Sequence, residues 1–452
     1  MLKKYDYDYV VIGSGAAGNT AAKIAAKMGV KTAIVESTTW GGKGFNGYDL
    51  PSRANLKLTH LYNEALKAKI GLAGASLRLN YHSLLEWQEK VVEKAGKNQV
   101  ELEKLGVATL EGRAKFVKSH QLLVGEKTVS GRRFLLATGA QLNTSGISGV
   151  SETNYLTPVE AWSLPRLPKS VLIVGGGATG CELAQYFAEL GVKTAIVELA
   201  GRLLPREDEE VGQVLENYFS KQLKIEVLTE VRATAISEDA LGKRVTIMHD
   251  GRESVVRMDA VVLATGATPS LDLELEKVGV KIEKRGLKVN NMLQTTAKYI
   301  FAAGDVLGEE SSAERAVYEG RLATYNALKR QRATAHYDGF IRVTNTFPQV
   351  ASVGATEDDC IKRDIKFKKS LTALSRVPAA AINGFEVGFV KMLATKQGKL
   401  LGATIVAPEA ELMIQEIAVA IRHNLSIVDL ASTPCVKLAW SELIRRAAKK
   451  LA

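Results

Sequence analysis

An octapeptide, Gly-Val-Lys-Thr-Ala-Ile-Val-Glu, occurs twice in this chain, at residues 29–36 and at residues 191–198. Each copy follows a glycine fingerprint of the form G-x-G-x-x-G, at residues 13–18 and 175–180. An apolar run rich in β-branched residues precedes each fingerprint, which predicts a strand, a tight turn and a helix. The chain is therefore expected to build the same nucleotide-binding unit twice.

The three glycines of such a fingerprint have separate roles. The first permits the turn, the second lets a pyrophosphate approach the backbone, and the third lets the helix pack closely on the strand. The first N–H groups of the helix then point at phosphate. In both copies an acidic residue, Glu36 or Glu198, follows the third glycine by eighteen positions, about where a carboxylate would bind a ribose. Two matched copies argue against a purely structural role for the glycines.

A second repeat marks the ends of these units. The sequence Ala-Thr-Gly-Ala occurs at residues 137–140 and at 264–267, each time after an apolar run, and residues 299–303 form another apolar run that leads into Gly304 and Asp305. With these motifs the chain resembles, over essentially its whole length, the pyridine nucleotide-disulfide oxidoreductase family of flavoproteins, which includes dihydrolipoamide dehydrogenase and mercuric reductase.

The resemblance implies an α/β fold with two Rossmann-like dinucleotide-binding domains and a C-terminal α+β dimerisation domain. Residues 1–150 and 268–338 would form the FAD-binding domain, 151–267 the NAD(P)-binding domain, and 339–452 the dimerisation domain of a homodimer. Within the last domain, the sequence predicts strands over 349–354 and 388–393 and an amphipathic helix over 409–422.

The resemblance also implies two cofactors, FAD at the first fingerprint and a nicotinamide dinucleotide at the second. The residues expected to contact FAD are Gly13, Gly15, Ala17, Gly18, Glu36, Gly42, Lys43, Thr138, Gly139, Gly304, Asp305 and Ala313. Those expected to contact NAD are Gly175, Gly177, Ala178, Thr179, Gly180, Glu198 and Gly266.

Two of the FAD residues have particular roles in the family. Asp305 would hold the ribityl chain, and Ala313 would begin a helix whose first amides stabilise negative charge on the flavin pyrimidine. An ordinary acidic helix start is the alternative for the second, since Ser311, Ser312 and Glu314 are sufficient for one.

The acidic residue of the second unit bears on the choice of nicotinamide. A carboxylate such as Glu198 accepts hydrogen bonds from a free 2′-hydroxyl but repels a 2′-phosphate, so NAD(H) is preferred over NADP(H). Arg202 lies close enough in sequence to weaken this preference.

The main departure from the family concerns its redox disulfide. The family segment resembles Gly-Gly-Thr-Cys-x4-Cys-x-Pro-Ser-Lys, whereas residues 41–53 read Gly-Gly-Lys-Gly-Phe-Asn-Gly-Tyr-Asp-Leu-Pro-Ser-Arg. Gly44 and Asp49 stand in the places of the two cysteines. Near the C-terminus, Lys437 replaces the family histidine that precedes Glu442. A lysine is protonated near neutrality and cannot serve as the base, so the disulfide relay and its acid–base partner are both missing.

The chain has three cysteines, which do not rebuild the motif. They are Cys181, Cys360 and Cys435, of which Cys181 follows the last fingerprint glycine, where a small residue is ordinary packing. Cys435 lies two positions before Lys437, in a segment that would approach the flavin across a dimer, and we expect it to be a buried, inert thiol.

Other parts of the family's flavin environment are present. Arg53 occupies the position of the lysine near flavin N5, and Glu182 that of its glutamate partner. The pair would orient the flavin and polarise N5, or it would be a structural ion pair between domains. Asp49 precedes Arg53 by four residues, a spacing that permits a helical contact that neutralises the arginine.

Glycines in the altered segment and charges near the C-terminus complete the expected active site. Gly44 and Gly47 leave room for a planar acceptor beside the flavin, or serve only the backbone geometry of the loop. In a family homodimer, Lys437 and Glu442 could face the flavin pocket of the other subunit.

The composition fits a protein of about three domains. The first strand begins within a few residues of the N-terminus and no apolar run reaches membrane-spanning length, so we expect a cytoplasmic protein. The net charge of +11, concentrated at residues 329–332, 362–369 and 445–450, indicates solvated faces, or attraction to an anionic membrane surface or an acidic electron-carrier protein. No motif indicates nucleic acid or a metal ion.

The expected function is an NAD(P)H-dependent FAD oxidoreductase that works without a disulfide. Hydride would pass from nicotinamide to flavin, and electrons directly to an acceptor. A quinone is the first choice of acceptor, since some disulfide-lacking members of the family are quinone reductases. The alternatives are an electron-transfer subunit that serves a protein partner and a non-catalytic FAD-binding component.

Overall fold

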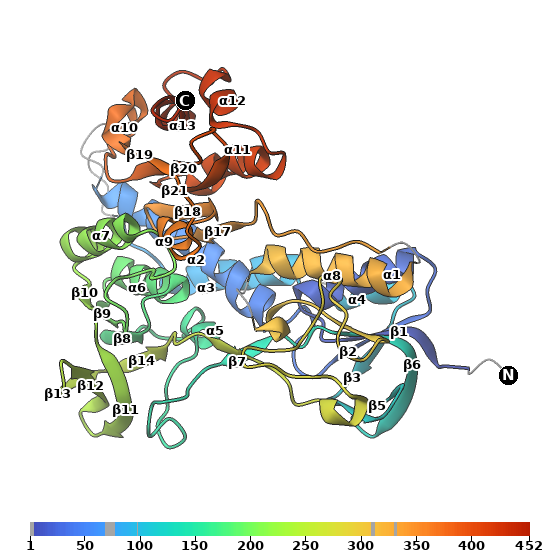
Figure 1. Ribbon diagram of the computed structural model, residues 1–452. Helices are drawn as coiled ribbons and strands as arrows, with labels where there is room; N and C mark the ends of the chain where they lie inside the picture. Colours follow the sequence, from blue (N-terminus) through green and yellow to red (C-terminus); the bar gives the residue numbers. More distant parts are fainter. Residues whose placement is uncertain (1–3, 68–76, 97, 309–311, 330–331) are drawn as a thin grey trace. The chain divides into compact units, whose positions relative to one another are not determined.

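The computed structural model describes residues 4–67, 77–96, 98–308, 312–329 and 332–452 (Figure 1). The chain forms two compact units. The first takes residues 1–54, 81–143 and 266–336, and the second takes residues 55–80, 144–265 and 337–452. The second unit thus combines the expected nicotinamide and dimerisation domains, and the division into three domains at the expected boundaries stays a prediction.

The first unit is built on a sheet whose central strands are parallel. The order is β3-β2-β1-β6-β5-β4, and β16 pairs with β6. These strands are β1 (Tyr7–Ile12), β2 (Thr32–Glu36), β3 (Ala108–Glu111), β4 (Ala114–Lys118), β5 (Gln121–Val124), β6 (Lys127–Leu136) and β16 (Ile300–Ala302). Because β1, β2, β6 and β16 are parallel, their carboxyl ends meet at one edge of the sheet, where the glycine fingerprint begins.

Helices α1 (Ala16–Lys27) and α8 (Ala313–Leu328) pack against each other in the first unit (Figure 1). Their contact depends on small residues, since a Cβ at Gly320 would lie 2.3 Å from the carbonyl oxygen of Ala17. The strand, turn and helix predicted for the first copy are therefore confirmed. The remaining elements of this unit include α3 (Tyr81–Ala95), α4 (Asn98–Lys104), β7 (Ala140–Leu142), β15 (Ala267–Pro269), η3 (Leu275–Val278) and η4 (Asp305–Leu307).

The second unit contains the second copy. A parallel sheet of order β10-β9-β8-β14 carries α6 (Ala178–Glu189), most of whose residues are buried. The strands are β8 (Ser170–Val174), β9 (Lys193–Val197), β10 (Glu226–Leu228) and β14 (Ala260–Leu263), accompanied by α5 (Pro158–Ala161), α7 (Glu209–Tyr218), η2 (Phe219–Leu223) and an antiparallel meander of β11 (Arg232–Asp239), β12 (Gly242–His249) and β13 (Arg252–Met258). The strand, turn and helix predicted for this copy are also confirmed.

The C-terminal part of the second unit is an antiparallel sheet of order β17-β18-β21-β20-β19 that shares a core with α11 and α13. Its strands are β17 (Ile341–Thr344), β18 (Gln349–Gly354), β19 (Lys368–Ala373), β20 (Phe389–Ala394) and β21 (Leu400–Ala407). Its helices are α9 (Glu357–Lys362), η5 (Leu374–Arg376), α10 (Pro378–Asn383), α11 (Ala410–Arg422), α12 (Ile427–Ser432) and α13 (Ser441–Lys449). The two strands and the helix predicted here are confirmed to within a residue.

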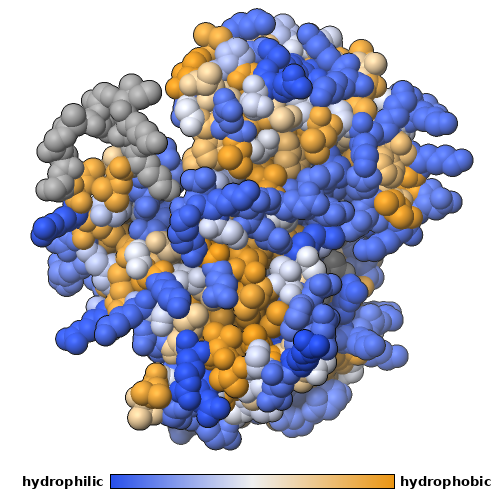
Figure 2. All heavy atoms as spheres, turned by 90° about the vertical axis from the view of Figure 1, so that its left-hand side faces the viewer, coloured by the Kyte–Doolittle hydropathy of each residue, from blue (hydrophilic) through white to orange (hydrophobic). Residues whose placement is uncertain are grey.

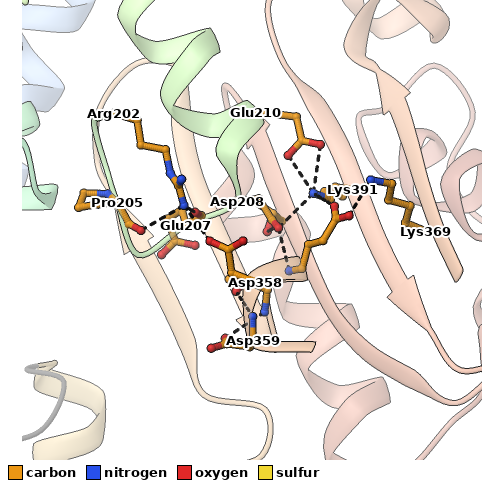
Figure 3. A network of polar contacts seen from close by, with 12 residues as sticks. Arg202, Pro205, Glu207, Asp208, Glu210, Asp358, Asp359, Lys369 and Lys391 are labelled. Carbon is orange, nitrogen blue, oxygen red and sulfur yellow. Dashed lines mark hydrogen bonds and ion pairs between the residues drawn. The ribbon is translucent and has the colours of Figure 1, made fainter. Parts of the chain in front are cut away.

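A buried lysine joins this C-terminal sheet to the segment that follows β9. Lys391 Nζ lies 3.1 Å from Asp208, 2.8 Å from Glu210 and 2.7 Å from Glu357 (Figure 3). Burial pushes the pKa of Lys391 down, but the hydrogen bonds to Glu210 and Glu357 and the charge of Asp208 outweigh burial and raise that pKa overall. Thr404 adds a hydrogen bond of 2.7 Å to Asp208. This lysine-centred network is one of the contacts that join the two parts of the second unit, together with the pairing of Arg342 and Glu207.

Figure 2 shows hydrophilic side chains over much of one face, with hydrophobic side chains between them. The basic side chains at 362–369 and 445–450 are exposed, as expected of solvated faces, except that of Arg445, which is 7% exposed and lies 2.6 Å from Glu416. Arg330 and Gln331 of the cluster at 329–332 lie outside the described residues. Over the part of the chain that the structure describes, no helix is long and apolar enough to cross a membrane.

Candidate functional site

Two glycines of the first fingerprint, Gly13 and Gly18, leave no room for a side chain. A Cβ at Gly13 would lie 2.2 Å from the carbonyl oxygen of Ala137, and one at Gly18 would lie 1.8 Å from that of Gly13. Gly42 lies against the same loop, since its Cβ would be 2.7 Å from Gly15 Cα. The structure thus brings Gly42 and Ala137, the residue before Thr138, against the first fingerprint. The backbone groups of these residues lie close together and fit a pyrophosphate.

Glu36 is held in a fixed orientation beside this cradle. Its Oε2 accepts hydrogen bonds from the backbone N–H and hydroxyl of Ser14, at 3.0 and 2.7 Å, and its Oε1 accepts from the N–H groups of Ser37 and Thr38, both at 2.8 Å. Burial by itself would raise the pKa of Glu36, but these hydrogen bonds outweigh it, so its pKa lies below the ordinary value of 4.5. An ionised carboxylate at the end of β2 suits a ribose hydroxyl.

We expect Glu36→Gln to change the pH dependence of stability. The folded-state pKa is depressed, so the carboxylate stabilises the fold above 4.5, and that contribution is lost as the pH falls through the lower folded-state value. Thermal unfolding of the wild type and the variant should differ at neutral pH and converge in acid. A difference in Tm that is the same at every pH would contradict this account. Glu283→Gln, at an exposed carboxylate, is the matched control.

The turn that contains Asp305 is held by a residue that the sequence did not indicate. Gly304 has a φ of +80°, and its N–H donates to Glu319 Oε2 at 2.8 Å. Glu319 is 1% exposed, and its other oxygen accepts from Arg315 Nε at 2.7 Å. The sequence signal that could have indicated Glu319 is its i,i+4 spacing from Arg315, which permits an ion pair on one helix face. Glu319 therefore positions the residue immediately before Asp305.

The helix predicted near the flavin pyrimidine begins where expected. Helix α8 starts at Ala313, and Ser312 caps it by accepting a hydrogen bond from the N–H of Arg315 at 3.1 Å. Ser311 lies outside the described residues. The structure supports a helix start at this position, and the contact with flavin stays a prediction.

The segment that replaces the disulfide motif is helical. A π-helix covers Phe45–Asp49 and runs directly into α2 (Leu50–Lys67). Its start is tied down by Asn46, whose Nδ2 donates to the carbonyl oxygen of Trp40 at 2.6 Å. Turns of π-helix occur often at functional sites. Asp49 ends this turn, while Lys43 before it and Arg53 after it are exposed.

The second fingerprint repeats the geometry of the first. A Cβ at Gly175 would lie 2.4 Å from the carbonyl oxygen of Ala264, and one at Gly180 would lie 1.8 Å from that of Gly175. Helix α6 begins at Ala178 after Gly177, and no described side chain caps it. Its first amides, which include those of Ala178 and Thr179, therefore suit a phosphate.

Glu198 is oriented by two backbone amides at the end of β9. Gly176 N–H donates to its Oε2 at 2.5 Å, and Ala200 N–H donates to its Oε1 at 2.7 Å. The carboxylate therefore lies beside the glycine loop, as the predicted ribose contact requires. Gly266, the other predicted NAD contact, belongs to the first unit, where its carbonyl oxygen accepts from Asn143 N–H at 3.0 Å, and its role stays a prediction.

Glu182 is held by a residue from outside its own helix. It is 2% exposed, and its Oε1 accepts from the backbone N–H of Asn345 at 2.6 Å and from Asn345 Nδ2 at 3.0 Å. No local pattern pointed to Asn345. Arg53 belongs to the first unit and Glu182 to the second, so their pairing stays a prediction.

The C-terminal segment has one feature that differs from the expectation. Cys435 is only half-buried, so the prediction of a buried thiol was wrong there, whereas Cys181 and Cys360 are buried and burial raises the pKa of both thiols. The expectation assumed that a free cysteine packs in the core, but residues 433–434 and 436–438 around Cys435 are exposed and form no strand or helix.

The two charged residues predicted near the C-terminus lie in different settings. Lys437 is exposed, while Glu442 is 9% exposed and accepts a hydrogen bond from Arg446 at 3.0 Å. That hydrogen bond, with smaller contributions from the N–H of Leu438 and the charge of Lys437, lowers the pKa of Glu442. Across the described residues, no group of three or more His, Cys, Asp or Glu side chains could hold a metal ion.

Comparisons with known proteins cover nearly the whole chain. The family described as "Pyridine nucleotide-disulphide oxidoreductase" matches residues 7–320, and the family described as the dimerisation domain of the same oxidoreductases matches residues 340–448. A mercuric reductase from Streptomyces lividans is 32% identical over 98% of this chain and 96% of its own length. Dihydrolipoyl dehydrogenase 1 from Arabidopsis thaliana mitochondria is 30% identical over 98% of this chain and 89% of its own length.

Solved structures agree with the fold. The HOCl-induced flavoprotein disulfide reductase RclA from Escherichia coli superposes with a TM-score of 0.87 at 22% identity, over 98% of this chain and 99% of that one. LpdA from Mycobacterium tuberculosis gives the same TM-score at 26% identity, over 98% of this chain and 99% of that one. The predicted α/β class with two Rossmann-like sheets and a C-terminal dimerisation domain is confirmed.

Proposed function

Because this chain belongs to the pyridine nucleotide-disulphide oxidoreductase family, we propose that it takes hydride from NADH through FAD and passes electrons directly to an acceptor other than a disulfide. Family membership supports a flavoprotein oxidoreductase that uses FAD and a nicotinamide dinucleotide. The proposal that the acceptor is not a disulfide rests on the presence of Gly44 and Asp49 where the family has its redox cysteines.

FAD, when bound, would accept hydride from the nicotinamide and release electrons to the acceptor. The chain's own residues would position the two cofactors. The glycine loops would bind the two pyrophosphates, and Glu36 and Glu198 would accept hydrogen bonds from ribose hydroxyls. Asp305 would hold the ribityl chain, in a turn whose preceding N–H is fixed by Glu319.

Arg53 and Glu182 would orient the flavin ring, with Asp49 close enough in sequence to neutralise Arg53. The two hydrogen bonds from Asn345 support this role for Glu182, because they hold its carboxylate in one orientation. A side chain that is already oriented loses little freedom when the cofactor binds.

The dimerisation match supports a homodimer. In that homodimer we propose that Lys437 and Glu442 face the partner's flavin pocket. Two apolar side chains next to Lys437, Val436 and Leu438, are 72% and 58% exposed. Exposed apolar side chains in such a group favour coverage by another subunit. Lys437 would then bring a positive charge to the acceptor rather than a base.

A quinone is the proposed acceptor. Gly44 and Gly47 supply no side-chain bulk in the altered segment, and a Cβ at Gly44 would have no atom within 4 Å, so neither residue would obstruct a planar molecule there. A cytoplasmic location, and attraction to an anionic membrane surface or an acidic electron carrier, stay predictions of the sequence.

Anaerobic titration with NADH tests the proposal. One equivalent should bleach the oxidised flavin absorbance without a thiolate charge-transfer band, and a quinone should restore it rapidly. Preference for NADH is checked by comparing kcat/KM for NADH and NADPH. Cys435→Ser should leave turnover intact, and loss of turnover with every acceptor would restore a thiol mechanism.

The two alternatives predict different results in the same titration. An electron-transfer subunit would be reduced by NADH but would need a protein partner to be reoxidised. A non-catalytic FAD-binding component would retain FAD and resist reduction by NADH.

A further inference from the structure

Arg202 lies on a turn that is pinned to the second glycine loop at two points. Gly176 N–H donates to Glu198 at 2.5 Å, and Leu204 N–H donates to the carbonyl oxygen of Gly176 at 2.9 Å. Between these contacts, Ala200 N–H donates to Glu198 at 2.7 Å. The backbone of Arg202 is therefore held next to the carboxylate proposed to bind the coenzyme ribose.

The side chain of Arg202 turns instead to the C-terminal part of the same unit. Its Nη2 lies 3.0 Å from Asp358 Oδ2 on α9, and 3.4 Å from the carbonyl oxygens of Pro205 and Glu207 (Figure 3). The Nε atom is buried and has no hydrogen-bond partner among the residues that the structure describes. Asp358 thus accepts a hydrogen bond from Nη2 alone, and the pair of donors Nε and Nη2 does not bind a carboxylate through two parallel hydrogen bonds.

Helix α9, which presents Asp358, is anchored independently of Arg202. The N–H of Glu357 donates to Asp208 at 3.0 Å, and the carboxylate of Glu357 lies 2.7 Å from Lys391. The side chain of Asp358 is 53% exposed. Replacing Asp358 would therefore remove the ion pair of Arg202 without disturbing the lysine-centred network, and would leave that side chain with its two longer contacts to the carbonyl oxygens of Pro205 and Glu207.

We propose that Asp358 is a specificity-determining residue, which holds Arg202 away from the 2′ position of the coenzyme ribose and so strengthens the preference for NADH. The inference rests on the proposed assignment of the second fingerprint to NADH. An arginine binds phosphate through two parallel hydrogen bonds, a stronger arrangement than its single hydrogen bond to Asp358. Without Asp358, Arg202 would be able to pair with a 2′-phosphate and offset the repulsion by Glu198.

The test measures binding of nucleotide fragments to the FAD-loaded protein by calorimetry at fixed ionic strength. The probes are 5′-AMP and 2′,5′-ADP, which differ only in the 2′-phosphate. In Asp358→Ala, 2′,5′-ADP should bind about fivefold more tightly relative to 5′-AMP than in the wild type, the size expected for loss of one partly exposed ion pair. Asp358→Asn should change the ratio in the same direction.

Two further variants distinguish Arg202 from a general gain in positive charge. Arg202→Ala alone should leave the ratio at its wild-type value, because Arg202 is already withheld. Arg202→Ala combined with Asp358→Ala should remove the gain. The proposal is wrong if the gain persists in the double variant, if Asp358→Ala produces none, or if Arg202→Ala alone weakens 2′,5′-ADP binding.

The proposed function and this inference fail differently. Fragment binding requires no reduction of the flavin, so a protein that NADH cannot reduce would still report whether Asp358 controls the ratio. Absence of binding by both fragments would overturn the coenzyme assignment and this inference together.

Discussion

Lys391→Met will lower the free energy of unfolding of the second unit by about 3–5 kcal/mol, the cost of leaving buried charges without their partner. Lys391 is 2% exposed and contacts Asp208, Glu210 and Glu357. Methionine keeps most of the side-chain volume, so the loss would come from the uncompensated carboxylates rather than from a cavity. Denaturant unfolding followed by circular dichroism, at equal protein concentrations, measures the difference.

Lys369→Met is the matched control for Lys391→Met. Lys369 pairs with the same carboxylate, Glu357, at 2.6 Å, but its side chain is 54% exposed. Exposed ion pairs contribute at most about 1 kcal/mol. If the two variants lose the same free energy, the buried network does not hold the C-terminal sheet to the coenzyme-binding part.

Gly180→Ala will abolish efficient flavin reduction by NADH while the protein keeps its FAD. The new Cβ would lie 1.8 Å from the carbonyl oxygen of Gly175, which is backbone and can yield only if the loop moves. Overpacking of this kind costs about 1–3 kcal/mol. Because NADH binds to the displaced loop, we expect a similar free-energy loss in binding, which corresponds to a roughly 10- to 100-fold lower NADH affinity. FAD content, Tm and the dissociation constant for NADH are the three measurements.

Gly177→Ala separates the nucleotide contact from the fold. Its Cβ would meet no atom within 4 Å and its φ is −72°, so alanine is sterically acceptable there. We expect an unchanged Tm but weaker NADH binding, because the second glycine lets the pyrophosphate approach the backbone. Normal NADH binding by Gly180→Ala or Gly177→Ala would show that this loop does not bind the coenzyme.

Local patterns determined much of this protein from the sequence alone. The two fingerprints, their strands and helices, and the acidic residues Glu36 and Glu198 are each encoded within about thirty neighbouring residues. The absence of the redox cysteines is also evident from the sequence, because positions 44 and 49 are glycine and aspartate. The choice of acceptor was beyond such patterns, since a small planar molecule requires no fixed motif.

Only the tertiary structure decided how the predicted residues are held. Asn345 reaches Glu182 across 163 positions in the sequence, Arg202 meets Asp358 across 156, and Lys391 meets Asp208 across 183. Pairs this distant have no period or spacing to reveal them, because chain folding rather than local conformation brings them together. The same reason explains Cys435, whose exposure depends on what packs around it and not on its neighbours in sequence. The sequence by itself thus determined which nucleotide-binding parts are present, and tertiary packing decided which side chains orient them.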